Sequence, residues 1–114
     1  MANPSHERSL KEFVAEAQEL CDALGQSVLH LDQPAPPPEL INEAFRAAHS
    51  LKGSSSVFGL GPMTAVSHGL ESALDAIRLG RLALSRGVVD VLLEAVALLG
   101  RLTAHLADPV RGDD

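Results

Sequence analysis

Residues 85 to 107 have the sequence SRGVVDVLLEAVALLGRLTAHLA, and the secondary structure of this segment decides the fold class of the chain. Three valines near its start are typical of a buried strand. The length of the segment and the acidic pair Asp90 and Glu94, four residues apart, favour a helix instead. The sequence therefore predicts a helix at 86–107. Residues at steps of three and four would face the core: Val89, Leu92, Val96, Leu99, Thr103 and Leu106.

Three earlier segments, at about 5–31, 38–58 and 62–80, show the same helical spacing of apolar residues. Ser9 and Glu12 either form a capping box at the start of the first helix or lie inside a helix that begins earlier. The residues predicted to face the core are Leu10, Phe13, Ala17, Leu20, Leu24, Val28 and Leu31 in the first segment, Ile41, Ala44, Phe45, Ala48, Leu51 and Ser55 in the second, and Met63, Val66, Ser67, Leu70, Ala73, Leu74 and Ile77 in the third.

Proline and glycine separate these segments. The run QPAPPP at 33–38 ends the first helix, because proline lacks an N–H and biases the residue before it away from helical geometry. Pro38 suits the first position of the next helix. Gly59 closes the second helix, Pro62 opens the third and Gly80 ends it. Four helices joined by short breaks predict an all-α fold, an up-down-up-down antiparallel four-helix bundle.

The composition limits the class of protein. The 114 residues fit one domain, predicted at 1–108 with a tail at 109–114. Apolar residues make up 46% of the chain but aromatic residues only 3%, which suits an aliphatic core between helices. The net charge is −6 and the nine Lys and Arg residues are scattered, so we expect no nucleic-acid partner.

Features of the chain also bear on its compartment. No segment approaches the roughly 20 apolar residues of a membrane span, and the N-terminus is charged where a secretory signal would be apolar. The single cysteine, Cys21, has no partner for an internal disulfide, and we expect it to be a small buried residue in a reducing compartment. The sequence thus predicts a cytoplasmic protein without membrane insertion.

A histidine, a lysine and a glycine lie together in the second predicted helix. At about 100° per residue, His49 falls at the rim of the buried face, with Lys52 and Gly53 one turn further on. Glycine in mid-helix costs about 1 kcal/mol relative to alanine. Access of another molecule to His49 would offset that cost.

The third predicted helix supplies an acid for this histidine. His68 and Glu71 lie three residues apart beside its apolar stripe. In an antiparallel neighbour of the second helix, Glu71 comes within hydrogen-bond reach of His49. A carboxylate that accepts from one ring N–H fixes the tautomer and leaves the lone pair of the other nitrogen directed outward. This arrangement makes the imidazole a nucleophile.

Several motifs together resemble a known family. HSLKGSSSVFGL at 49–60 follows FRAA at 45–48, SHGLE stands at 67–71, and the likeness continues through IRLGRLALSRGVVDVLL at 77–93. The chain resembles the histidine phosphotransfer (HPt) domain at the N-terminus of chemotaxis-type, CheA-like histidine kinases. The resemblance covers essentially the whole chain.

The resemblance implies a role for each site residue. His49 would accept a phosphoryl group on its outer nitrogen and pass it to an aspartate of a response regulator. Glu71 would hold the inner nitrogen, Lys52 would help to neutralise the phosphate, and His68 would complete the polar network. Gly53 would leave room for the docking regulator. The exposed residues around His49, such as Arg46, Ser50 and Ser56, would set the choice of regulator.

The resemblance also implies what the chain lacks. We expect no cofactor in this chain, because no ATP site or metal-ligand cluster is visible in the sequence. ATP and Mg²⁺ would come from the partners, a histidine kinase catalytic domain and a response regulator receiver domain. The module would be a substrate and carrier, one part of a protein-histidine kinase, rather than an enzyme on its own.

Two alternatives remain open at this point. A helical interaction bundle, with His49 as an ordinary surface residue, would take no label from ATP and a cognate kinase. A metal-binding bundle would use His49, His68 and Glu71, but di-iron bundles need more carboxylates than these and Lys52 would repel a cation. The remaining histidines fit no cluster and are expected at the surface: His6, His30 and His105.

Overall fold

The computed structural model describes residues 4–107, and their side chains from residue 9 onward. The predicted tail at 109–114, the domain boundary at 108 and the side chain of His6 lie outside the described residues. Within them the chain forms four helices and no strand, which confirms the all-α prediction, including the helix over the valines of the last segment. The helices are α1 (Pro4–His30), α2 (Pro38–Val57), α3 (Gly61–Arg78) and α4 (Arg86–Ala107).

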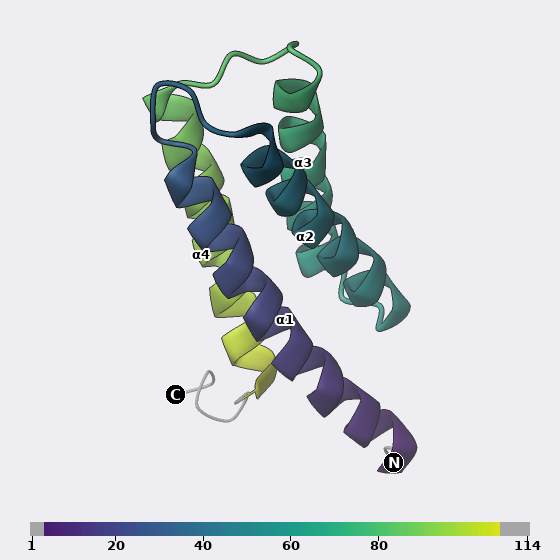
Figure 1. Cartoon of the computed structure of the whole chain (residues 1–114). Helices are drawn as coiled ribbons and strands as arrows, with labels where there is room; N and C mark the ends of the chain where they lie inside the picture. The colour runs from purple at the N-terminus through teal and green to yellow at the C-terminus, as the bar shows by residue number, and fades with distance from the viewer. Residues whose placement is uncertain (1–3, 108–114) are drawn as a thin grey trace.

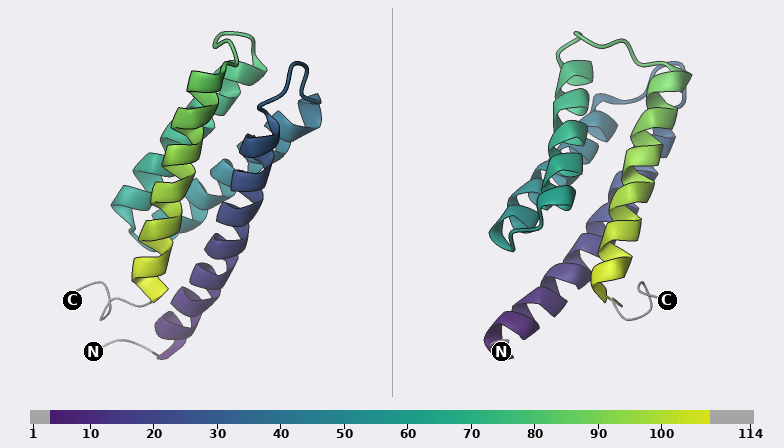
Figure 2. Two further views of the ribbon diagram at one scale, coloured as in Figure 1. Left: turned by 90° about the vertical axis from the view of Figure 1, so that its left-hand side faces the viewer. Right: turned by 180° about the vertical axis from the view of Figure 1, so that it is seen from behind.

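Consecutive helices run in alternating directions, as Figure 1 shows. Each helix packs against two others: α1 against α2 and α4, and α3 against α2 and α4. The α2–α3 contact is the most extensive and the α3–α4 contact the least. The N-terminal part of α1 extends beyond the ends of the other helices in all views (Figures 1 and 2). The up-down-up-down antiparallel bundle is thus confirmed.

Both ends of α1 and α3 and the C-terminal end of α2 differ from the predicted ends by one or two residues, whereas the start of α2 and both ends of α4 are as predicted. Helices α2 and α3 end at Val57 and Arg78, because Gly59 and Gly80 adopt positive φ angles of 67° and 75°. In both turns the backbone N–H of the residue after the glycine donates to a carbonyl of the last helical turn. In α2 this bond joins Leu60 N to Ser55 O at 3.0 Å. This is the glycine-terminated Schellman motif, which stops a helix before the glycine.

The start of α1 resolves the choice left open by the sequence. The helix begins at Pro4, so Ser9 and Glu12 lie inside it rather than at its cap. Pro38 is the first residue of α2, as predicted, and Glu39 lies in its first turn. A negative charge there is favourable beside the helix N-terminus.

The core is aliphatic and drawn from all four helices. Leu24, Leu51, Leu74 and Leu99, one from each helix, are completely buried. Most of the predicted core positions are confirmed, and the following are only partly buried, at the edge of the core: Leu10, Leu20, Ile41, Phe45, Val66, Ala73 and Leu106. Burying this apolar surface is the main stabilising term of the fold.

Cys21 is buried and unpaired, as expected. Burial raises the pKa of its thiol, although a weak contact of 4.0 Å with Thr103 Oγ1 opposes this. A raised pKa keeps the group protonated at neutral pH, which suits a structural rather than a reactive cysteine.

None of the helices within residues 4–107 combines the length and the apolar character that crossing a bilayer requires.

Candidate functional site

The predicted histidine and acid meet across the α2–α3 contact. His49 lies in the middle of α2, and its Nδ1 hydrogen-bonds to Glu71 Oε2 on α3. Lys52, one turn further along α2, donates to the other oxygen of the same carboxylate, with 2.6 Å between Nζ and Oε1. The structure therefore brings three of the predicted residues together around one carboxylate.

The charge on Glu71 decides the direction of the His49 bond. Glu71 is only 12% exposed. Its pKa is lowered, chiefly because Lys52 donates a hydrogen bond to it; burial opposes this and the His49 bond adds to it. An ionised carboxylate can only accept, so Nδ1 of His49 must carry the proton. In the neutral ring the lone pair then lies on Nε2.

The imidazole of His49 is largely open to solvent. Its side chain is 63% exposed, and no hydrogen bond within the described part of the chain involves Nε2. Gly53 lies beside it on the exposed face, and a Cβ added there would meet no atom within 4 Å. A second molecule thus has open access to Nε2.

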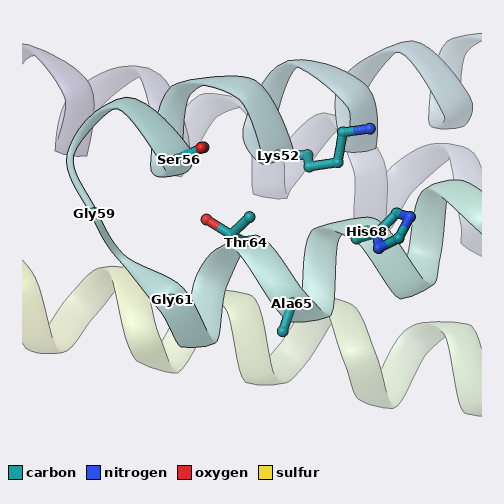
Figure 3. Close-up of a pocket in the computed structure, with 7 residues that line it drawn as sticks. All are labelled: Lys52, Ser56, Gly59, Gly61, Thr64, Ala65 and His68. Atoms are coloured by element: carbon teal, nitrogen blue, oxygen red, sulfur yellow. The ribbon is translucent and has the colours of Figure 1, made fainter.

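His68 lies apart from this hydrogen-bonded group. No hydrogen bond or ion pair in residues 9–107 joins it to His49, Lys52 or Glu71. It lines a pocket of about 500 Å³ between α2 and α3, and Figure 3 shows it on the α3 side with Lys52 on the α2 side. Its role in the network stays a prediction.

The turn between α2 and α3 is held by the hydroxyl groups of a buried serine and a partly buried threonine. Ser55 and Thr64 hydrogen-bond to each other at 2.8 Å, and Thr64 also donates to Leu60 O. These bonds lie one turn beyond Lys52 and fix how α3 returns along α2. The sequence analysis placed Ser55 inside for its position on the helix and did not foresee this partner.

The structure adds an aromatic ring that the sequence analysis assigned to the core. Phe45 is only partly buried, and its ring stacks on the imidazole of His49, with 6.2 Å between centroids and 14° between planes. Arg78 of α3 lies over the Phe45 ring at 4.5 Å. A phenylalanine four residues before the histidine was the available signal, since residues i and i+4 share a helix face.

The metal-binding alternative finds little support in this geometry. Both oxygens of Glu71 are already engaged, by His49 and Lys52. In the part of the chain that the structure describes, no three His, Cys, Asp or Glu residues are grouped so that they could hold a metal ion.

Comparison with known protein families agrees with this geometry. The family model of the Hpt domain matches residues 8–106 of the chain. The chain belongs to the Hpt domain family. The Hpt match extends over parts of α1 and α4, all of α2 and α3, and every residue of the site described above.

Several curated proteins are similar to this Hpt domain. A chemotaxis protein CheA of Borreliella burgdorferi is 34% identical over 103 residues, which are 90% of this chain and 12% of that protein. The sensor histidine kinase CheAY of Helicobacter pylori is 31% identical over 99 residues, 87% of this chain and 12% of that protein. The Hpt domain thus spans about an eighth of the length of these relatives.

A solved structure has the same fold. The CheA phosphotransferase domain from Thermotoga maritima superimposes with a TM-score of 0.83 at 32% identity, over 90% of this chain and 98% of that one. The bundle is therefore the fold of a phosphotransferase domain of CheA.

Within the described part of the chain, the residues predicted to be exposed, both outside the site and around His49, are exposed in the structure. His30 and His105 are exposed, as predicted for histidines outside the site. Arg46, Ser50 and Ser56, the residues expected around His49 on α2, are exposed as well. The surface next to His49 thus carries side chains that a partner could contact.

Proposed function

We propose that this Hpt domain is a phosphorelay carrier in chemotaxis-type two-component signalling. His49 accepts a phosphoryl group from an ATP-dependent histidine kinase domain and passes it to an aspartate of a response regulator receiver domain. Membership of the Hpt family and the likeness to CheA proteins support this proposal. Because ATP is an intracellular nucleotide, the exchange takes place in the cytoplasm.

The observation that carries the proposal is the orientation of one ring. His49 Nδ1 donates to Glu71, while Nε2 has no hydrogen bond among the described residues and belongs to an exposed side chain. A lone pair held in this direction can attack phosphorus in a docked partner. Phosphoryl transfer asks mainly for such positioning and for charge stabilisation.

The two transfers balance without further reagents. In the first, the Nε2 lone pair attacks the γ-phosphorus of ATP, an N–P bond forms, and the bond to the bridging oxygen breaks with its electrons leaving on ADP. In the second, a carboxylate oxygen of the regulator attacks the same phosphorus and the N–P bond breaks, which returns the lone pair to Nε2. Nδ1 keeps its proton on the Glu71 side throughout.

The other site residues assist these steps. Lys52 keeps Glu71 ionised, and its positive charge, one turn from His49 on α2, helps to neutralise the phosphate. Gly53 leaves the surface beside His49 open to the partner. Lys52 beside Glu71 disfavours a second cation at this carboxylate, and we expect ATP and Mg²⁺ to come with the kinase and regulator domains.

The proposal is tested with γ-labelled ATP and a CheA-type kinase catalytic domain. The wild-type domain should take acid-labile label, and His49→Gln should take none while its helix content is unchanged. His105→Gln is the matched control, because His105 is exposed on α4 and away from Glu71. Label that persists on His49→Gln refutes the assignment, and a wild-type domain that takes no label favours a simple interaction bundle.

A further inference from the structure

Phe45 connects the phosphoacceptor ring to an arginine on the neighbouring helix. The guanidinium of Arg78 lies 4.5 Å from the centroid of the Phe45 ring. Asp75, one turn earlier on α3, holds that guanidinium through two hydrogen bonds, 2.5 Å from Nη2 and 3.2 Å from Nε. The Phe45 ring in turn lies nearly parallel to the imidazole of His49. Arg78, Phe45 and His49 thus form one continuous stack from α3 to the site, and Asp75 holds the arginine at its far end.

One hydrogen bond is not enough to fix an exposed imidazole. The bond to Glu71 fixes where Nδ1 points, but the ring can still tilt about that bond and carry Nε2 with it. Apart from this bond, His49 is largely exposed. A parallel ring beside it restricts the tilt, because offset-stacked rings favour a limited range of interplanar angles.

The aromatic ring needs a support of its own. Phe45 is only partly buried, so core packing alone does not hold its plane. A cation over the ring face is attracted by the π-electrons, and Arg78 is kept in place by Asp75. The position of Arg78 on α3 is therefore transmitted through Phe45 to the plane of His49.

We propose that Phe45, supported by Arg78, is a positioning residue for phosphoryl transfer: it sets the tilt of the His49 ring and so the direction of the Nε2 lone pair. This inference rests on the proposed function of His49. Neither Phe45 nor Arg78 contacts the phosphoryl group in this account. Both act through His49, so their effect depends on how strictly the phosphoryl donor demands one direction of attack.

Two phosphoryl donors distinguish an effect on the direction of attack by Nε2 from an effect on the intrinsic reactivity of the His49 ring. A docked kinase domain with ATP presents phosphorus in one direction, whereas phosphoramidate is a small donor that approaches freely. Phe45→Leu keeps an apolar side chain but removes the ring, and it should slow transfer from the kinase about tenfold, the scale expected for a small misplacement of a reacting atom. The rate with phosphoramidate should remain that of the wild type. Phe45→Tyr keeps the ring and should restore the rate with the kinase.

Arg78→Gln tests the support without touching either ring. It should reduce the rate with the kinase in the same direction as Phe45→Leu. It should also shift the NMR signals of the His49 ring protons, because the ring current of Phe45 moves with its plane. Arg81→Gln is the control for lost positive charge, since Arg81 is exposed and forms no ion pair within the described residues.

Phe13→Leu is the control for a lost aromatic ring in general. Phe13 packs on Phe58 at 5.2 Å between centroids, in another part of the bundle. Wild-type transfer rates in Phe45→Leu and Arg78→Gln, with unmoved His49 signals, overturn this inference while leaving the phosphorelay proposal standing. An equal loss with both donors also overturns it, because reactivity rather than direction would then have changed. A wild-type domain that takes no label removes the proposed function itself, whatever the NMR signals do.

Discussion

Lys52 Nζ donates a 2.6 Å hydrogen bond to Glu71 Oε1, from the turn of α2 that follows His49. The second oxygen of that carboxylate is thereby left for the imidazole. The lysine also supplies the main reason why the pKa of Glu71 is lowered. The cation thus acts on His49 indirectly, by keeping its partner ionised and able only to accept.

Replacing Glu71 tests this control of the ring. Glu71→Ala removes the acceptor that holds Nδ1–H, and transfer from the kinase should slow by about tenfold or more, as for other carboxylates that orient a histidine. The free energy of unfolding should fall by no more than about 1 kcal/mol, because the pairs it breaks are partly exposed. Initial rates of labelling and urea unfolding curves measure the two effects. Wild-type kinetics in Glu71→Ala contradict the proposed tautomer control.

Acid should weaken the fold through the same carboxylate. The pKa of Glu71 in the folded state lies below its usual value near 4.5, mainly because of Lys52. The stability this provides is complete above the unfolded pKa and is lost as the pH falls through the lower folded pKa. The difference in unfolding free energy between His49→Gln and the double variant His49→Gln with Glu71→Gln should therefore be constant above about pH 5.5, shrink from about pH 4.5 downward and level off only below the folded pKa of Glu71. A difference that grows on acidification has the wrong sign for this account.

Two buried serines should respond to alanine in opposite ways. Ser55 and Ser67 are both fully buried, but Ser55 hydrogen-bonds to Thr64 whereas the hydroxyl of Ser67 has no partner among the described residues. Ser55→Ala leaves Thr64 short of a bond and should lower the unfolding free energy by about 1 kcal/mol. Ser67→Ala removes an unsatisfied group and should raise it by a similar amount. Thermal unfolding of the two variants, measured under the same conditions, shows whether their effects are opposite. Equal destabilisation by both contradicts the hydrogen-bond assignment.

Replacing Gly53 by alanine should raise the stability of the domain and slow its transfer reaction. Its added Cβ has open space around it, and its φ angle is not positive. Gly53→Ala should therefore stabilise α2 by up to about 1 kcal/mol. If the open surface serves docking, the same variant should slow transfer to a receiver domain while leaving the rate with phosphoramidate unchanged. Unchanged transfer to the receiver domain would remove docking as the reason for the glycine.

The secondary structure was largely predictable because local signals agreed with each other. The proline run before Pro38 and the glycines at 59 and 80 interrupt clear helical patterns. Prediction overran the ends of α2 and α3 because a Schellman turn occupies the residue before the glycine. The hydrophobic spacing predicts that this residue is helical, although in the structure it is the C-cap residue.

The site was predictable only where residue type and helix face sufficed. His49, Lys52 and Glu71 were found because two antiparallel helices of known faces bring them together. Phe45 was assigned to the core because its position lies on the buried stripe of α2, and its contacts with Arg78 and His49 depend on how far α3 covers that end of the stripe. That depth of packing is a tertiary property with no counterpart in the spacing of residues along one helix.

All the side chains that handle or orient the imidazole come from one hairpin, α2 and α3. Contacts within a hairpin close short stretches of chain, so they form rapidly and at small entropic cost. The outer helices α1 and α4 act as a scaffold that buries the back of the hairpin. Substitutions in that scaffold should therefore change the stability of the folded domain. The chemistry at the imidazole depends instead on about forty consecutive residues, those of α2 and α3.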